Sequence, residues 1–401
     1  MDARLNIPYG RQSISEDDIQ AVVNVLRSDW LTQGPTVPVF ENALAASCKS
    51  KYAVAVNSAT SALHIACLAL GVGPGDYVWT TPNTFVASAN CARYCGADID
   101  FIDIDPVTMN ISVTDLAHRL AAAEKNGKLP KVIIPVHFAG LPCDMKAIHA
   151  LSKKYGFRII EDASHAIGAK YLDQPIGNGN FSDITVFSFH PVKIITTAEG
   201  GAAVTNNEAL AARMALLRSH GITRDSSAFR NDYLGPWQYE QHELGFNYRL
   251  TDLQAALGIS QLHRLEQFVE RRNELAKIYD AMLANLPVRR PYRAEEHLSA
   301  YHLYVIRLED QFIHREVFET LRGEGISVNL HYTPVHLQPY YRQLGFAPGD
   351  FPQAEHHGTC AISLPIYPDM CDDEVDRVVT ALKWAIEQHQ PTKELEHAHI
   401  S

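Results

Sequence analysis

The chain has 401 residues, of which 46% are apolar and 20% are charged, a composition typical of a folded globular protein rather than a disordered one. Its 35 basic and 46 acidic residues give a net charge of −11, which argues against non-specific binding to nucleic acid or to an anionic membrane. The seven cysteines are scattered and lack paired Cys-x2-Cys spacing, so we expect reduced thiols and no metal site.

The N-terminal residues MDARLN lack the apolar segment of a secretory signal. No stretch of the chain reaches the roughly 20 apolar residues that cross a bilayer. We therefore expect a cytoplasmic protein that does not enter the membrane.

Between residues 53 and 205, short β-branched segments alternate with segments that carry apolar residues at helical spacing. The pattern predicts seven strands, at residues 53–56, 77–80, 98–104, 131–137, 158–161, 184–188 and 202–205. Helices are predicted between them, at residues 58–70, 86–95, 114–124 and 145–154. This alternation indicates an α/β fold with a three-layer αβα arrangement around a mainly parallel seven-stranded sheet.

After Thr251 a helical pattern runs from Leu253 to Leu283, which is longer than a typical globular helix, and we expect it to connect two domains. Beyond it the pattern predicts a smaller α+β domain, with strands at residues 303–308 and 328–332 and helices at residues 314–323 and 373–387. We place the large domain with its N-terminal arm at residues 1–255, the small domain at residues 256–390 and a flexible tail at residues 391–401.

One lysine stands in apolar surroundings. Lys193 lies in the segment SFHPVKIITTAEGG (residues 188–201), directly after a predicted strand. Most lysines are solvated surface charges. Burial lowers the pKa of an ammonium group, however, and the neutral amine can attack a carbonyl and form a Schiff base. The segment therefore indicates a lysine that binds a carbonyl cofactor.

Such a cofactor needs a carboxylate for its ring nitrogen and a site for its phosphate. Asp162 ends a predicted strand, and an ionised carboxylate there would keep a pyridine nitrogen protonated; a helix-capping aspartate is the alternative. The segment NSATSAL (residues 57–63) brings backbone N–H groups and hydroxyls to the positive end of a helix. Any capped helix after a strand looks similar, so this signal alone is weak. Ser188, five residues before Lys193, would add a phosphate hydrogen bond; a merely structural serine at a strand end is the alternative.

Phosphate site, carboxylate and lysine follow in this order along one α/β region. In this order and in its motifs the chain resembles the fold-type I, pyridoxal 5′-phosphate (PLP)-dependent aminotransferases that act on nucleotide-linked sugars, the DegT/DnrJ/StrS family, from about Ile7 to Ile386. The matching segments are LTQGP (31–35), NSATSAL (57–63), PNTF (82–85), PVH (135–137), EDASHA (161–166), SFHPVK (188–193), EGG (199–201), HG (220–221) and NYR (247–249).

The resemblance implies that Lys193 is the Schiff-base lysine and proton carrier and that Asp162 is the partner of the ring nitrogen. It also implies cofactor contacts from Ala59, Thr60, Phe85, His165 and Ser188. Phe85 would stack on the ring, and Ala59, Thr60 and Ser188 would surround the phosphate. For His165 the alternative is a core histidine with a satisfied hydrogen bond. Asn247 would reach the cofactor phosphate of the neighbouring subunit, which implies a homodimer with shared active sites. Pyridoxamine 5′-phosphate would be the amine form of the cofactor.

The segments IPYGRQ (7–12), 57–64, 188–199 and HGI (220–222) resemble the branch of the family that makes the pseudaminic acid precursor. Members of that branch aminate C4 of a UDP-linked 4-keto-6-deoxy-N-acetylhexosamine of the L-arabino configuration, with L-glutamate as donor. The product is UDP-4-amino-4,6-dideoxy-N-acetyl-β-L-altrosamine. Branches that use UDP-4-keto-arabinose or perosamine-type sugars share the core motifs, so these substrates stay open.

The resemblance also implies sugar contacts from Tyr9, Trp30, Leu31, Thr32, His331, Tyr332 and Thr333. A half-buried core aromatic is the alternative for Trp30, and the end of a strand is the alternative for His331 and Tyr332. The UDP diphosphate needs cationic partners, for which Arg230, Arg249, His336 and Arg342 are available.

Three other functions compete. A nicotinamide-dependent oxidoreductase is disfavoured because the Gly-rich segment at residues 71–76 follows a helix and precedes a strand, the reverse of the dinucleotide fingerprint. A non-catalytic sugar-sensing regulator on this fold is disfavoured by Lys193 and Asp162. A dehydratase with the same cofactor would carry histidine at position 193.

Overall fold

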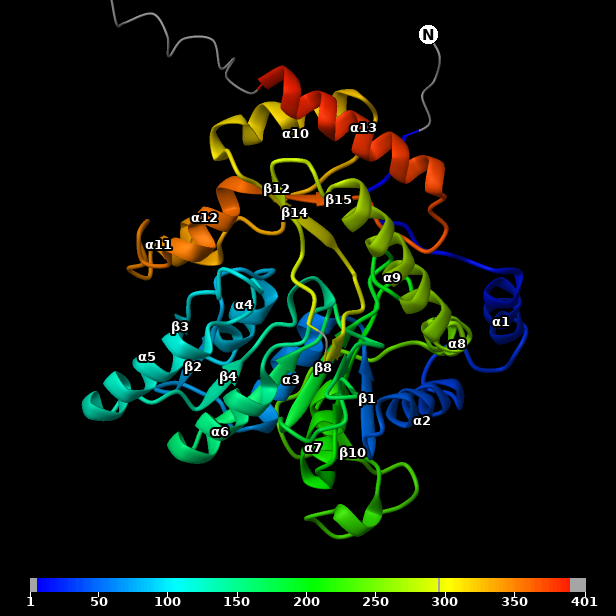
Figure 1. Ribbon diagram of the computed structural model, residues 1–401. Coiled ribbons are helices and arrows are strands. Elements are labelled where there is room, and N and C mark those ends of the chain that lie inside the picture. The colour runs from blue at the N-terminus through cyan, green and yellow to red at the C-terminus, as the bar shows by residue number, and fades with distance from the viewer. Residues whose placement is uncertain (1–5, 295, 390–401) are drawn as a thin grey trace, which may run out of the picture.

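The computed structural model describes residues 6–294 and 296–389. A seven-stranded sheet forms its centre, in the strand order β1-β9-β8-β5-β4-β2-β3 (Figure 1). The strands are β1 (Tyr52–Val56), β2 (Tyr77–Thr80), β3 (Asp98–Phe101), β4 (Val132–Ile134), β5 (Arg158–Asp162), β8 (Ile184–Ser188) and β9 (Gly201–Thr205). Strand β9 is antiparallel to both neighbours, and the other pairs are parallel. The predicted mainly parallel seven-stranded sheet is confirmed.

Helices cover both faces of this sheet, as the three-layer prediction requires. Alternate residues of a strand point to opposite faces, and in β1 Val54 and Val56 join one apolar cluster while Ala55 joins another. The first cluster includes side chains of α3 (Ala59–Ala69), α4 (Ala87–Tyr94) and α7 (Glu208–Arg218). The second includes side chains of α2 (Thr36–Cys48), α5 (Val113–Asn126) and α6 (Met145–Tyr155).

Strand β4 is shorter than predicted because of Pro135. Proline has no N–H to donate to a ladder, and β4 ends at Ile134. Contact with β5 nevertheless resumes beyond the proline, where the N–H of Asp162 donates to the Pro135 carbonyl at 2.9 Å and the N–H of His137 donates to the Asp162 carbonyl at 3.1 Å.

The long helix predicted from Leu253 to Leu283 is wrong as a single element. The structure has α8 (Asp252–Leu262) and α9 (Leu265–Met282), with a break at His263 and Arg264. The Arg264 guanidinium pairs with Asp18 of α1 (Glu16–Leu26) and donates to the Ser13 carbonyl at 3.0 Å. The break thus coincides with a tertiary contact, although the helical periodicity continues through it.

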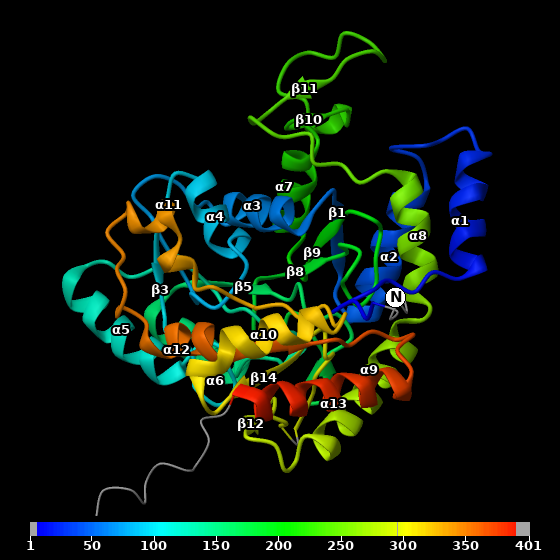
Figure 2. The same ribbon diagram turned by 90° about the horizontal axis from the view of Figure 1, so that it is seen from above.

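A second, three-stranded antiparallel sheet follows α9, made of β12 (Val288–Arg289), β14 (Tyr304–Leu308) and β15 (Ala361–Leu364). Helices α10 (His314–Gly323) and α13 (Asp372–His389) lie side by side across it (Figures 1 and 2). The α+β character predicted for this region is confirmed, and Ile7 of the N-terminal arm packs into its core and pairs with Ile326.

The strand predicted at residues 328–332 is wrong. Only Asn329 pairs there, as an isolated bridge to Ser363. The next amides are bound by side chains instead: the N–H of Leu330 donates to Asn329 Oδ1 at 2.9 Å, and that of Tyr332 donates to Asn83 Oδ1 at 3.2 Å. Side-chain acceptors thus replace the ladder partners of this segment.

The other strands and α-helices of the described residues are short. They are β6 (Lys170–Tyr171), β7 (Gln174–Pro175), β10 (Ile222–Thr223), β11 (Glu240–Gln241), β13 (His297–Leu298), α11 (Pro339–Arg342) and α12 (Pro352–Cys360). Strand β13 pairs with β6, so residues on either side of the predicted domain boundary at 255/256 share a small sheet, and that boundary stays a prediction. The hairpin of β10 and β11 projects away from the sheet beyond α7 (Figure 2).

None of the helices in the described ranges is long and apolar enough to cross a membrane. The tail predicted at residues 391–401 lies outside the described residues.

Candidate active site

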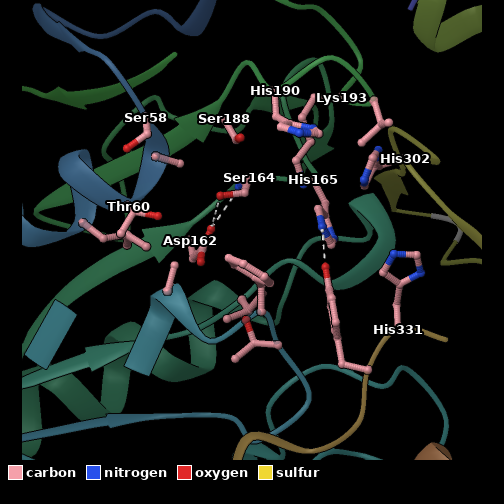
Figure 3. A pocket seen from close by; sticks show the side chains of 18 of the residues that line it. Ser58, Thr60, Asp162, Ser164, His165, Ser188, His190, Lys193, His302 and His331 are labelled. Atoms are coloured by element: carbon pink, nitrogen blue, oxygen red, sulfur yellow. Dashed lines mark hydrogen bonds between the residues drawn. The ribbon is translucent and has the colours of Figure 1, made fainter. Parts of the chain in front are cut away.

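A cavity of about 510 Å³ opens at the carboxyl ends of β5 and β8, where α/β folds collect their ligands. Figure 3 shows Ser58, Thr60, Asp162, Ser188 and Lys193 in its wall. The structure brings together ten of the residues predicted from the sequence: Tyr9, Ala59, Thr60, Phe85, Asp162, His165, Ser188, Lys193, His331 and Tyr332.

The start of α3 forms an anion cradle in this cavity. Ser58 is the N-cap, with its Oγ accepting the N–H of Ser61 at 3.1 Å. The N–H groups of Ala59 and Thr60 belong to the first helical turn, in which backbone N–H groups have no acceptor within the helix. Strand β9 passes close by because Gly201 lacks a side chain: a Cβ there would lie 2.4 Å from the Ala59 nitrogen. Free amides and hydroxyls at a helix N-terminus suit a phosphate.

Asp162 is held rigidly at the end of β5. Its Oδ2 accepts the Ser88 hydroxyl at 2.6 Å, and its Oδ1 accepts the hydroxyl of Ser164 at 2.6 Å and the Ser164 N–H at 3.1 Å. Asp162 as a whole is 4% exposed. Turns rather than a helix follow it, so the helix-capping alternative is wrong. The two serines hold a charged acceptor in a fixed orientation on the cavity wall.

Lys193 follows β8 through a turn in which its N–H donates to the His190 carbonyl at 2.9 Å. Its side chain lines the cavity and remains partly accessible from it. Burial lowers the pKa of the Lys193 amine to about 8, and the opposing effect of the Asp162 charge does not cancel this shift. A substantial fraction of the amine is therefore neutral, and nucleophilic, near neutral pH.

Histidines occupy the side of the cavity away from Ser58 and Thr60 (Figure 3). His165 is fully bonded: its Nδ1 accepts the N–H of Ala139 at 3.3 Å, and its Nε2 lies 3.1 Å from the Tyr332 hydroxyl. Burial, reinforced by the charge of Lys193, holds the pKa of His165 well below its usual range, so the ring is neutral. His165 is therefore both a core histidine whose ring nitrogens are hydrogen-bonded and a residue of the cavity wall.

His302 also lines the cavity, and sequence reasoning missed it. It precedes β14 in the segment AYHLYVIRL, where the strand pattern dominates the signal. Its ring lies 4.4 Å from that of His165, centroid to centroid, a proximity that only the fold creates.

Several predicted residues lie outside the cavity of this chain. Trp30 and Leu31 are 55% and 48% exposed, and Thr32 pairs with Thr251. Asn247 pairs with Ser219, outside the cavity wall.

Thr333 and the four candidate cations for the diphosphate, Arg230, Arg249, His336 and Arg342, are likewise absent from that wall. His336 is buried against Glu355 at 2.9 Å. Within the described residues that line the cavity, Lys193 is the one lysine, and there is no arginine.

The sequence matches the DegT/DnrJ/EryC1/StrS aminotransferase family over residues 12–383. The chain belongs to this family. It is 39% identical, over 94% of its length and 96% of the other protein, to the spore coat polysaccharide biosynthesis protein SpsC of Bacillus subtilis.

Two solved structures, each 32% identical, are similar over 96% of the chain. The candidate sugar aminotransferase Spr1654 of Streptococcus pneumoniae, known in PMP, apo and PLP forms, gives a TM-score of 0.88 over 100% of its length in the PMP form. Helicobacter pylori PseC, an aminotransferase of pseudaminic acid biosynthesis, gives 0.86 over 100% of its length. The protein is thus a sugar aminotransferase with pyridoxal phosphate as cofactor.

The cavity fits this cofactor on its own geometry. It combines an amide and hydroxyl cradle for a phosphate, a fixed buried carboxylate for a ring nitrogen and an amine of lowered pKa for an aldehyde. Pyridoxal phosphate supplies the aldehyde and an electron-withdrawing ring when bound.

Proposed function

We propose that this aminotransferase moves the amino group of L-glutamate to the C4 ketone of a UDP-linked 4-keto-6-deoxy-N-acetylhexosamine of the L-arabino configuration. The products are 2-oxoglutarate and UDP-4-amino-4,6-dideoxy-N-acetyl-β-L-altrosamine, a precursor of pseudaminic acid. The observation that carries the transamination is the single cavity that holds the Lys193 amine, the Asp162 carboxylate and the α3 cradle. The sugar assignment rests on similarity to PseC over its full length.

Each group of the cavity has a proposed role toward the cofactor. The amides of Ala59 and Thr60 and the hydroxyl of Ser188 bind the phosphate, and Asp162 binds the ring nitrogen. Phe85, which is 59% exposed in this chain, stacks against the ring. The neutral tautomer of His165 packs nearby.

Lys193 acts as both nucleophile and proton carrier in this proposal. Its Nζ takes the proton from Cα of glutamate and, in the second half-reaction, returns a proton to C4 of the sugar. The lowered pKa of Lys193 suits both transfers, because an amine with a pKa of about 8 accepts and releases protons near physiological pH. The face of the sugar that receives the proton is set by how the sugar docks relative to Nζ.

We propose a homodimer with shared active sites. Tyr9, His331 and Tyr332 contribute the sugar side of the cavity from one chain. The diphosphate requires cations, and among its lysines and arginines the described cavity wall offers only Lys193, which is assigned to the cofactor. Asn247 and the exposed residues Trp30 and Leu31 are available to a second subunit. Thr32 and Thr333 are also proposed as sugar contacts, because the family resemblance implies them.

Similarity to SpsC supports a second candidate, an aminotransferase for another nucleotide-linked 4-keto sugar such as UDP-4-keto-arabinose or a perosamine-type sugar. A panel of UDP-, dTDP- and GDP-linked 4-keto sugars, assayed with glutamate for 2-oxoglutarate release, distinguishes the two. Preference for the UDP-linked L-arabino N-acetyl sugar supports the first candidate. Preference for any other sugar removes it and leaves the aminotransferase activity standing.

A further inference from the structure

A buried arginine without a carboxylate partner lies directly behind the cavity wall. Arg272 of α9 is 0% exposed, and its Nη1 donates to the carbonyls of Tyr301, His302 and Ile366 at 3.1, 3.3 and 2.9 Å. Its Nε and Nη2 have no partner, and no acidic side chain of the described residues acts on its charge, since burial alone lowers the pKa of Arg272, to about 10. An uncompensated buried cation is costly. Its positive potential extends toward the adjacent cavity.

His302 links this guanidinium to the cavity, because its carbonyl accepts from Arg272 and its residue lines the cavity wall. His302 is 4% exposed, its Nδ1 is buried without a partner, and no hydrogen bond to its Nε2 is found among the described residues. Burial holds the pKa of His302 well below its usual range, and the charges of Lys193 and Arg272 act in the same direction, as do His165 and His331. The ring is therefore neutral, and in either tautomer its one N–H is unused by the protein.

Two further donors border the same side. His331 Nδ1 lies 2.8 Å from the Ser363 hydroxyl; in the tautomer in which Nδ1 accepts that proton, Nε2 carries the N–H, for which the described residues offer no partner. Because His165 Nδ1 is an acceptor, its Nε2–H donates to Tyr332, so the phenol proton of Tyr332 is also uncommitted. Unused N–H and O–H donors, backed by a positive charge, form a site for an anion.

We propose that His302 binds a carboxylate of the amino donor, with the charge of Arg272 behind it attracting that carboxylate. The inference rests on the proposed transamination and identifies its donor subsite. A carboxylate suits the site because it accepts hydrogen bonds from neutral imidazole and phenol groups. The cavity wall of the described chain has no arginine to bind it instead.

The test uses the holoenzyme and glutarate, which carries both carboxylates of glutamate but neither an amino nor a keto group. Glutarate binding is measured by calorimetry for wild type, His302→Leu, His302→Asn and His302→Gln. Leu has no N–H donor, and the shorter Asn side chain holds its N–H too far from the cavity. For both variants we expect the Kd for glutarate to rise at least tenfold. Gln keeps an N–H at similar reach, so we expect a rise of only two- to threefold.

His297→Gln is the matched control, because His297 on β13 also has a buried Nδ1 without a partner but lies outside the cavity. It should bind glutarate like wild type. In steady-state assays the His302 variants should raise the KM for glutamate in parallel with the Kd, with the KM for the sugar nucleotide within twofold of wild type.

Unchanged glutarate binding in His302→Asn, or an equal rise in both KM values, would overturn the inference. The Asn variant decides the matter if the Leu variant does not fold. Failure of the proposed function has a different signature: wild-type holoenzyme would release no 2-oxoglutarate from glutamate, whatever the glutarate affinities are.

Discussion

The lowered pKa of Lys193 makes a quantitative prediction about its reactivity. The pKa is about 8, against an ordinary value of 10.5. At pH 7 the neutral fraction is then roughly one in ten, instead of roughly one in three thousand, because each pKa unit changes the ratio tenfold. In cofactor-free protein, Lys193 should therefore present about 300-fold more neutral amine at pH 7 than an amine of ordinary pKa, and react with a small aldehyde faster by up to that factor at equal access.

The Asp162 charge provides a second perturbation with a defined sign. That charge raises the pKa of Lys193. Asp162→Asn removes it while keeping a side chain of the same shape for Ser88 and Ser164. The pKa should fall further, and the midpoint of the labelling curve should move to lower pH.

The assay is reductive methylation with formaldehyde and borohydride across pH 6 to 11, quantified by peptide mass. The exposed Lys51 in the same digest reports the pH dependence of the reagent itself. A midpoint for Lys193 near 10.5, or an upward shift in Asp162→Asn, would refute the electrostatic reasoning.

Three further changes test the site and its supports. Lys193→Ala should abolish 2-oxoglutarate release from glutamate, and Lys193→Arg should do the same because it keeps the charge but not the amine chemistry; a wild-type rate in either would contradict the role of Lys193. Gly201→Ala places a Cβ 2.4 Å from the Ala59 nitrogen, so the free energy of unfolding, measured by thermal denaturation, should fall by about 1–3 kcal/mol, and the cofactor should bind more weakly. The control Gly73→Ala, which has open space around it, should change neither. Asp252→Ala removes the acceptor of the Gly34, Thr36 and Val37 amides at 3.2–3.3 Å and should cost about 1–3 kcal/mol in denaturant unfolding; stability equal to wild type would show that these amides find other partners.

Local patterns in the sequence predicted most of the central sheet and the helices that cover it. The strands of the central sheet are buried apolar runs between capped helices, so their number and approximate positions followed from periodicity. Features that coincide with distant contacts did not follow: α8 ends beside the Arg264–Asp18 pair, and in the segment 328–332 the N–H of Tyr332 bonds the Asn83 side chain instead of a strand partner. Neither partner is near in sequence, and periodicity carries no information about them.

For the active site, the sequence by itself indicated the residues that we propose to bind the cofactor. Lys193, Asp162 and the α3 turn stand where strands end, and parallel strands that end on one edge bring their end residues together. The tertiary structure alone decided what faces them. His302 and Arg272 come from segments about 30 residues apart that meet behind the cavity, and their unpaired nitrogens exist only because folding buries them without partners. Burial and missing partners are properties of packing in three dimensions, and no local sequence pattern encodes them.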